Sequence, residues 1–177
     1  MDRDAVEYSE WFNIMKGILI QRGSMRMNLG FRTMGGNFSV RSAALVIENN
    51  SLLVAKSDNF DCYYVVGGTV QENETSETAL VRELYEETGY HWETERLVFI
   101  QERIYPVGNE MHHQIVFFYL MKKTDAVIAN GVNTDQQNEH LYWLPLVDLE
   151  NVNLVPPFLK TKLKSLPVKF EHIVSYE

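Results

Sequence analysis

One segment of this sequence restricts the fold more than any other, the apolar run at residues 115–121. It reads Ile-Val-Phe-Phe-Tyr-Leu-Met and is apolar at almost every position. A strand with one face in water alternates apolar and polar residues, whereas a continuous apolar run is typical of a central strand covered on both faces. The chain therefore needs a sheet with a packing layer on each side, and 177 residues suffice for one such domain.

Shorter apolar and alternating runs predict further strands. Residues 42–48 and 52–56 are expected to form a hairpin, because Asn49 and Asn50 between them tolerate the left-handed backbone of a tight turn. Other strands are expected at residues 62–66, 97–105, 113–121 and 141–144.

Two helices are expected among these strands. One covers residues 75–87. The other begins near Pro156 and Pro157, where proline suits a first turn, and ends near residue 165. Strands with interspersed helices predict an α/β fold, an α/β/α sandwich with a mixed β-sheet.

The first 24 residues predict an amphipathic helical extension in front of a main domain at residues 25–177. Apolar side chains recur in it at helical spacing, and Gly23 is a suitable end. We expect this stripe to pack against the domain or against a second copy in a homodimer, because two glutamates beside it disfavour binding to an anionic bilayer. The stripe consists of Tyr8, Trp11, Phe12, Met15 and Leu19, and the glutamates are Glu7 and Glu10.

Charge and composition argue against several functions. The formal net charge of −8 disfavours binding to long nucleic acid, which needs a basic face. An acidic protein can still bind phosphate groups when a divalent metal lies between them and its carboxylates. Cys62 is the only cysteine, so no intrachain disulfide forms, and neither a signal peptide nor a membrane span is expected. These features predict a cytoplasmic protein that acts on small molecules.

The stretch at residues 67–90 carries the chemistry. Its second half predicts a helix, because Thr75 is a good N-cap and Gly89 suits the left-handed residue that closes a helix. A glycine pair, Gly67 and Gly68, follows the third expected strand and lets backbone groups approach a bound ion closely.

Three glutamates share one side of this helix. At about 100° per residue, Glu83, Glu86 and Glu87 fall within a roughly 100° arc beside the apolar face. Carboxylates this close repel one another unless a cation intervenes, and oxygen ligands on one rigid face are what Mg²⁺ prefers. A solvated acidic face is the common alternative explanation for such a run.

The spacing of the surrounding residues weighs against that alternative. A glycine, a glutamate and the sequence Arg-Glu-Leu-x-Glu-Glu-x-Gly follow one another at the intervals of the Nudix box, and chance would produce seven such identities in roughly one chain in 10⁶. The chain thus resembles the Nudix hydrolase family, most specifically in this box and more loosely from about residue 31 to residue 158. The matching residues are Gly68, Glu74, Arg82, Glu83, Leu84, Glu86, Glu87 and Gly89.

The resemblance implies a metal site and its ligands. Glu83 and Glu87 would hold Mg²⁺ or Mn²⁺. Glu86 would add a ligand or bind the water of the metal, and the Gly67 carbonyl would complete the shell. A polarised water would then attack a phosphorus atom, and no covalent enzyme intermediate is implied.

The resemblance also implies structural roles within the box. Arg82 and Glu74 would form an ion pair that orients the loop against the helix, and Gly68 and Gly89 would shape the turns at its two ends.

The implied activity is hydrolysis of a diphosphate linkage in a nucleoside diphosphate joined to another moiety, either a nucleoside triphosphate or an ADP-ribose-like compound. A nucleotide-binding sensor with the same fold and little turnover is the alternative. Such modules typically lose box carboxylates, whereas all of them are present in this sequence. Subfamilies are marked by Pro or by Tyr beyond the box, and Tyr105-Pro106 offers both, so the substrate stays open.

Several residues outside the box are candidates for the same site. Glu139 lies in a polar stretch where many family members carry an extra catalytic carboxylate, and a solvated loop residue is an equal alternative. Arg41 and Arg103 are candidates to bind a substrate phosphate, although arginine at a strand end often only extends into water. Tyr64 or Tyr105 could stack on a base, although packing in the core or at the rim is the safer assumption.

Three other polar residues carry less weight. Glu102 could face the same cleft, but an ordinary exposed strand position is the better explanation. His112 and His113 flank the long apolar strand, where a histidine is usually a hydrogen-bonding or edge residue, so we expect no metal role for either.

Overall fold

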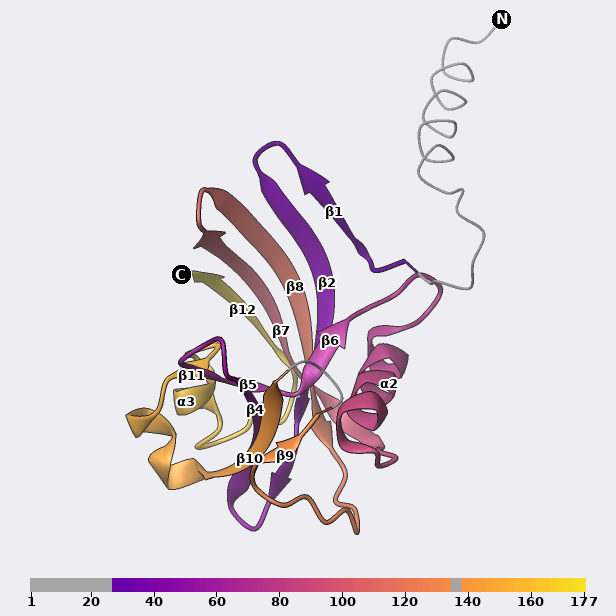
Figure 1. The fold of residues 1–177 in the computed structure, drawn as a ribbon, viewed down its shortest axis with the longest axis vertical. Helices are drawn as coiled ribbons and strands as arrows, with labels where there is room; N and C mark the ends of the chain where they lie inside the picture. The colour runs from indigo at the N-terminus through magenta and orange to yellow at the C-terminus, as the bar shows by residue number, and fades with distance from the viewer. Residues whose placement is uncertain (1–26, 135–137) are drawn as a thin grey trace, which may run out of the picture.

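The structure, a computed structural model, describes residues 27–134 and 138–177. Two mixed sheets form its centre (Figure 1). The larger sheet has the strand order β1-β2-β8-β7-β12, with β6 paired to β2. Its strands are β1 (Gly30–Thr33), β2 (Gly36–Leu45), β6 (Gly67–Thr69), β7 (Thr94–Val107), β8 (Glu110–Met121) and β12 (Glu171–Tyr176).

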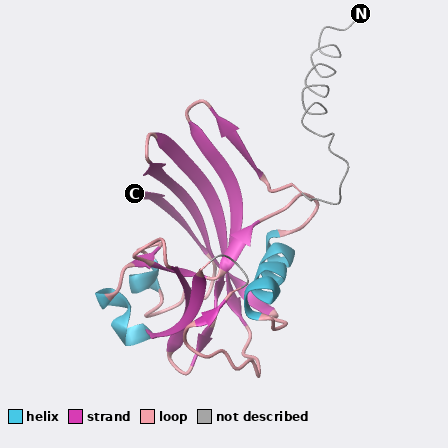
Figure 2. Cartoon of the chain, viewed as in Figure 1, coloured by secondary structure: helices cyan, strands magenta, loops and turns pink. Residues whose placement is uncertain are grey.

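The smaller sheet has the order β11-β5-β4-β10-β9, with β3 paired to β4. Its strands are β3 (Ile47–Glu48), β4 (Ser51–Ser57), β5 (Tyr63–Val65), β9 (Val132–Asn133), β10 (Glu139–Pro145) and β11 (Leu154–Val155). The helices are α2 (Ser76–Thr88), the 3-10 helix η1 (Leu146–Asn151) and α3 (Leu159–Lys162). Figure 2 shows α2 on one side of the strands and the two short helices on the other.

β8 contains the apolar run and is a central strand, as predicted. It lies between β2, to which it is parallel, and β7, to which it is antiparallel. Phe118 packs in one hydrophobic core, and Met121 packs in another. Both faces of this end of β8 are therefore covered by other parts of the chain.

The two cores lie on opposite faces of the strands. Neighbouring residues of β2 alternate between them, since Ala43 belongs to the first core and Ala44 to the second. α3 contributes Leu159 to the first core, whereas α2 contributes Leu80 and Leu84 to the second. This arrangement confirms the expected α/β/α sandwich.

The strands divide between two mixed sheets, where the sequence had suggested one. The chain leaves β2 after Leu45 and enters β3 at Ile47, so it changes sheets at Val46. The hairpin that follows has the predicted turn, because Asn49 and Asn50 both have positive φ, 46° and 60°. Apolar periodicity places residues on strands, but it does not say where a strand exchanges one partner for another.

α2 has the expected ends. The hydroxyl of Thr75 accepts a hydrogen bond from the N–H of Thr78, and Gly89 closes the helix with φ 73°. The second predicted helix was too long, because only Leu159–Lys162 is α-helical. Beyond it the backbone tightens to three-residue turns, with the N–H of Ser165 donating to the carbonyl of Lys162 at 3.3 Å.

One long-range pairing was absent from the sequence prediction. β12 pairs in parallel with β7, with Ser175 opposite Arg103. Its sequence is half polar, so no apolar run marks it. The predicted N-terminal helix lies outside the described residues, and among the residues that are described no helix is long and apolar enough to cross a membrane.

Candidate active site

Two glycines in β6 bring its backbone against α2. A Cβ atom on Gly68 would lie 2.0 Å from Cδ of Glu83, so any other residue there would collide with that carboxyl group. Gly67 has φ 149°, and a Cβ atom on it would lie 2.2 Å from the carbonyl oxygen of Ser42. Gly68 therefore permits the Glu83 carboxylate to lie directly on the β6 backbone, and Gly67 permits β6 to lie close to β2.

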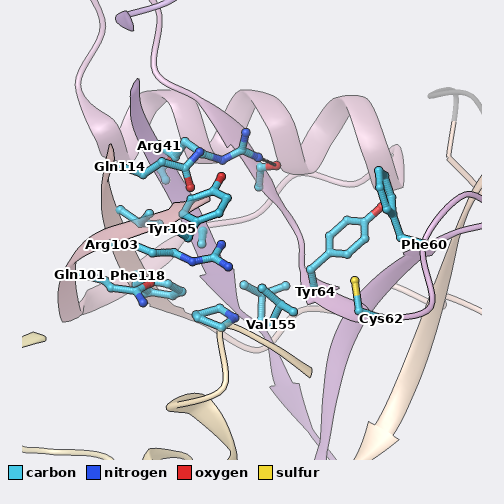
Figure 3. Close-up of a pocket in the computed structure, with 16 residues that line it drawn as sticks. Arg41, Phe60, Cys62, Tyr64, Gln101, Arg103, Tyr105, Gln114, Phe118 and Val155 are labelled. Carbon is cyan, nitrogen blue, oxygen red and sulfur yellow. Dashed lines mark hydrogen bonds between the residues drawn. The ribbon is translucent and has the colours of Figure 1, made fainter. Parts of the chain in front are cut away.

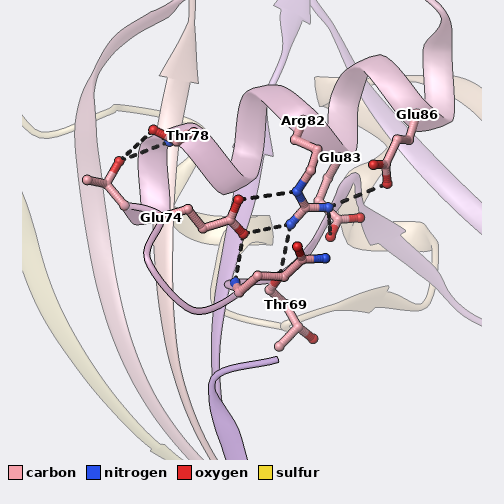
Figure 4. Close-up of polar contacts among 8 residues, drawn as sticks. Thr69, Glu74, Thr78, Arg82, Glu83 and Glu86 are labelled. Carbon is pink, nitrogen blue, oxygen red and sulfur yellow. Dashed lines mark hydrogen bonds and ion pairs between the residues drawn. The ribbon is translucent and has the colours of Figure 1, made fainter. Parts of the chain in front are cut away.

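Arg82 connects this backbone to the helix and to the preceding loop (Figure 4). Its Nη2 donates to Oε1 of Glu74 at 2.8 Å and to the carbonyl of Thr69 at 3.3 Å. Its Nη1 donates to Oε1 of Glu83 at 2.8 Å and to Oε2 of Glu86 at 3.4 Å. The hydrogen bond to Glu74 is the main reason that the pKa of Arg82 rises above its ordinary value.

Glu74 is the most enclosed partner of Arg82. Only 2% of its side chain is exposed. Its Oε1 also accepts the backbone N–H of Gln71 at 2.7 Å, and its Oε2 accepts Nε of Arg82 at 3.3 Å. A buried carboxylate held by a two-pronged guanidinium and a backbone N–H fixes the loop geometry strongly.

Four glutamates line one cavity of about 370 Å³, which we call the acidic cavity. Glu83, Glu86 and Glu87 reach it from α2, and Glu139 reaches it from the first position of β10. Glu83 and Glu87 are buried, whereas the side chain of Glu86 is half-exposed. The structure thus brings Glu139 beside the carboxylates of the box, although 52 positions separate Glu87 from it in the sequence.

Glu87 is the least compensated of these acids. Burial raises its pKa to about 9, and the nearby carboxylates of Glu139 and Glu83 add to the rise. Arg41 acts in the opposite direction but does not offset them. Without a further cation, Glu87 therefore holds a proton at neutral pH.

Glu139 is positioned by two hydroxyl groups. It accepts a short hydrogen bond from the Tyr64 hydroxyl and another from Oγ1 of Thr134 at 3.2 Å. The pKa of Tyr64 is raised, first by burial and then by this bond to Glu139. Tyr64 consequently stays a neutral hydrogen-bond donor beside the carboxylate.

The donor set of the acidic cavity suits a hard divalent cation. Carboxylate and carbonyl oxygens are the ligands of Mg²⁺ and Mn²⁺. A cation near Glu83, Glu87 and the Gly67 carbonyl would relieve the repulsion that raises the pKa of Glu87. In residues 27–134 and 138–177, no group of three or more His, Cys, Asp and Glu side chains is already drawn together to hold a metal, and Arg82 engages Glu83 and Glu86.

Comparison of the sequence with known protein families matches the region that contains β6, the loop after it and α2. The NUDIX domain model covers residues 38–166, which include every residue of the acidic cavity from Arg41 to Glu139. The chain belongs to the Nudix family. The human 8-oxo-dGDP phosphatase NUDT18 is similar to it, with 26% identity over 110 residues, 60% of this chain and 32% of that protein. The match thus spans about a third of the length of that curated relative.

Solved Nudix structures share the fold. The MutT protein from Bacillus halodurans has a TM-score of 0.63 at 11% identity, over 78% of this chain and 89% of that one. A Nudix hydrolase from Nitrosomonas europaea has a TM-score of 0.53 at 14% identity, over 82% of each chain. At these identities the two structures support the architecture and not a particular substrate.

A second cavity of about 380 Å³ adjoins the Nudix box (Figure 3). We call it the apolar cavity. Arg41, Tyr64 and Gly67 line both it and the acidic cavity. In Figure 3, Arg41 lies toward one end of the apolar cavity, and Tyr64 lies toward the other. Two of the three residues expected to bind substrate therefore stand where the cavities meet.

Arg103, the third of those residues, lines the apolar cavity but is already paired. Its Nη2 lies 2.6 Å from Oε2 of Glu177, and its guanidinium lies 4.0 Å from the centre of the Tyr105 ring. Arg103 and Tyr105 therefore form a flat wall of the cavity, and Glu177 neutralises the charge of Arg103.

Two of the remaining polar residues face away from the Nudix site. Glu102 alternates with Gln101 and Arg103 on β7, so it points to the opposite face of the larger sheet. There its Oε1 lies 3.3 Å from Nε2 of His113. The suggestion that Glu102 shares the cleft is therefore wrong.

Sequence reasoning overlooked several residues of the apolar cavity. Gln101 and Gln114 line it from β7 and β8, and Phe60 lines it from the loop before β5. Gln101 is only 1% exposed, and its Nε2 donates to Oγ of Ser175 at 2.9 Å. Gln101 and Arg103 lie two positions apart, so the sequence already indicates that they share one face of a strand. It does not indicate that this face lines a cavity until the neighbouring strands are known.

Substitution of Arg82 should cost stability. Arg82→Ala leaves the buried Glu74 carboxylate without its partner, so the free energy of unfolding in urea should fall by about 3 kcal/mol. Arg82→Lys keeps the charge but not the two-pronged contact, so its free energy of unfolding should fall by a smaller amount. If the lysine variant were as stable as the unchanged protein, the paired geometry would not matter.

The stability of the metal-free protein should depend on Glu87 and pH. The pKa of this carboxyl is about 9 when folded against an ordinary 4.5, so its proton stabilises the fold fully below pH 4.5, and this stabilisation is lost as pH rises toward 9. The glutamine of Glu87→Gln stays neutral at every pH. The free energy of unfolding of this variant should therefore increase relative to that of the unchanged protein as pH rises. Each pKa unit is equivalent to about 1.4 kcal/mol. In urea unfolding with EDTA, the free energies of unfolding of the variant and of the unchanged protein should therefore differ by at least about 1 kcal/mol more at pH 9 than at pH 4.5. A difference in the free energy of unfolding that does not change with pH would contradict this prediction.

Proposed function

We propose that this protein is a Mg²⁺- or Mn²⁺-dependent hydrolase that cleaves a diphosphate linkage in a nucleoside diphosphate joined to another moiety. Either a nucleoside triphosphate or an ADP-ribose-like compound fits that description. The observation that carries the proposal is the acidic cavity, where Glu87 is buried beside Glu83 and Glu139 and its pKa is raised by that burial and by those two carboxylates. Nudix membership and the name of the human relative support the same class of reaction.

In this proposal Glu83 and Glu87 hold the metal, with Glu86 as a further ligand or as a partner of its water. The Gly67 carbonyl lies on the same cavity wall and adds a backbone oxygen. A divalent ion bound there would polarise a phosphoryl oxygen and lower the pKa of a bound water. Because Arg82 engages Glu83 and Glu86 in this structure, metal binding would have to share these two carboxylates with it.

The remaining residues act on the substrate and on the attacking water. Arg41 donates N–H groups toward the phosphates from the junction of the two cavities. Glu139 accepts a proton from the water as it attacks phosphorus, while the P–O bond to the leaving phosphate breaks. Tyr64 keeps Glu139 in place through its hydroxyl. The Arg103 and Tyr105 wall offers a surface for a base.

The metal assignment predicts loss of activity on neutralisation of either proposed ligand. Hydrolysis should require Mg²⁺ or Mn²⁺ and stop when EDTA is added. Glu83→Gln and Glu87→Gln should each lower kcat by about 10²-fold or more, because charge stabilisation in the transition state depends on the position of the metal. Release of phosphate or nucleoside monophosphate from a panel of nucleotide diphosphate compounds gives the readout.

The matched control is Glu93→Gln, at an exposed residue paired with Lys122 outside the site. It should keep the activity of the unchanged protein. Near-normal turnover of both the Glu83 and Glu87 variants, on every compound that is cleaved, would show that the metal lies elsewhere.

Glu139→Gln tests the proposed base separately. If Glu139 accepts the proton of the attacking water, kcat should fall by about 10²-fold with little change in KM. The variant keeps the shape of the side chain and the contact with Tyr64, so it should remain folded. Turnover within twofold of the unchanged protein would return Glu139 to a purely structural role.

A further inference from the structure

One face of the larger sheet is only partly covered by the described residues. α2 packs over the end of this face that holds Ala44 and Tyr119, and the hydroxyl of Tyr119 lies 2.8 Å from Oγ of Ser76 in the first turn of the helix. The long strands β2, β8 and β7 extend well past α2 (Figure 1). Neither of the two cores formed by the described residues includes the side chains that continue this face beyond Tyr119.

The strand register defines the uncovered surface, which we call the open sheet face. Residues opposite one another in neighbouring strands point to the same side of a sheet, and so does every second residue along a strand. Nine apolar positions share this side, and they come from all five long-range paired strands: Phe31 of β1, Phe38 and Val40 of β2, Ile115 and Phe117 of β8, Ile100 and Ile104 of β7, and Val174 and Tyr176 of β12.

The described part of the chain leaves this apolar surface open to water. Phe31 is 61% exposed, Val174 is 52% exposed and Tyr176 is 78% exposed. The ring of Phe31 stacks on that of Phe38 with the ring centres 5.1 Å apart, so the surface is continuous from β1 to β2. A contiguous apolar surface of this kind marks an interaction site.

The few polar groups of the open sheet face restrict the partner. Glu102 lies at its middle, with Oε1 3.3 Å from Nε2 of His113 and Oε2 3.6 Å from Nε2 of His172. Among the described residues of this face there is no lysine or arginine. Phosphate groups of a nucleic acid or of an anionic bilayer therefore find no strong cation there, and an apolar polypeptide surface is the better match.

The chain itself reaches the edge of this face from its N-terminal side. The carbonyl of Met27 accepts the N–H of Glu72 at 2.8 Å, and Asn28 forms a β-bridge with Gln71. The chain then enters β1, the edge strand, whose Phe31 already belongs to the open sheet face. The residues before Met27 are therefore joined to the domain beside the surface that needs a cover.

That segment has the length and the chemistry to cover it. Its sequence predicts a helix with one apolar stripe, and the helical rise from Tyr8 to Leu19 is about 17 Å. The open sheet face extends across four strand spacings from β1 to β12, which is about 19 Å. Residues 20–26 reach about 23 Å when extended, enough to bring the stripe back over the sheet.

The covalent connection favours this segment over a second copy of the chain. A short linker gives a tethered segment an effective concentration on the order of millimolar, so that docking needs little intrinsic affinity. A second copy must bind from solution and lose its translational and rotational freedom. Of the two occupants that the sequence leaves open, the tethered one is therefore favoured.

We propose that residues 8–19 dock as an amphipathic helix on the open sheet face of the same chain, with their apolar stripe against Ile115, Phe117 and Val174. The docked helix lies beside α2, on the side of the sheet opposite the apolar cavity. It completes the covering layer on that side, and this role does not depend on the proposed hydrolytic activity.

The first test measures access of a reagent to the open sheet face. In a Cys62→Ser background, Val174→Cys places a thiol on this face, and Val168→Cys places one at a residue that is 93% exposed and lies outside it. In the full chain, Val174→Cys should react with a maleimide at least tenfold more slowly than Val168→Cys. Equal rates would show that the face is open and would overturn the proposal.

A second pair of substitutions identifies what covers the face. Phe12→Asp places a charge in the apolar stripe, so it should release the segment and speed the reaction of Val174→Cys at least tenfold. Asn13→Asp adds the same charge at about 140° from the centre of the stripe and should leave the rate unchanged.

Two results would assign the face to a second copy and overturn the proposal. One is protection of Val174→Cys that persists in the Phe12→Asp protein. The other is protection that weakens on dilution of the full chain, together with a dimer mass in analytical ultracentrifugation. The proposal expects a protected monomer whose labelling rate is independent of protein concentration.

Discussion

The contact between the Arg82 guanidinium and the buried Glu74 carboxylate is the one on which the rest of the site depends. It joins a loop, a strand backbone and a helix at a single planar group, since Arg82 also binds Thr69 and Glu83. A guanidinium has donors enough for all these partners in fixed directions, which no other side chain offers. The loop before α2 is thereby held, and with it the distance between β6 and the acidic face of the helix.

That rigid frame lets the protein tolerate an unfavourable charge arrangement. Glu87 lies buried beside Glu83 and Glu139, and its raised pKa reflects the free energy needed to ionise it there. An exposed helix would relieve such repulsion by rotating side chains into water, but burial on the sheet prevents it. A site of this kind gains stability from any divalent cation that enters, which couples metal binding to the protonation of one carboxyl group.

The larger sheet supplies the surroundings of this acidic centre. β7 and β8 present Gln101, Arg103 and Gln114 on the face that carries the apolar cavity, while α2 packs over the opposite face. Glu177 takes up the charge of Arg103, and Arg41 remains as the guanidinium without an ion pair among the described residues that line the cavities. The larger sheet thus presents Arg41, which is free to bind phosphate, apart from the wall of Arg103 and Tyr105, which suits flat or hydroxyl-bearing groups.

The sequence alone determined what local patterns encode. The apolar run of β8, the asparagine turn, the caps of α2 and the spacing of Arg82, Glu83 and Glu87 all depend on neighbours within a few residues, so the fold class and family followed from them. Tertiary structure decided what depends on strand pairing: the division into two sheets, the position of β12, the approach of Glu139 to Glu87 and the direction of Glu102 away from the cleft. These features arise between segments far apart in the chain, and apolar periodicity contains no information about which strands become neighbours.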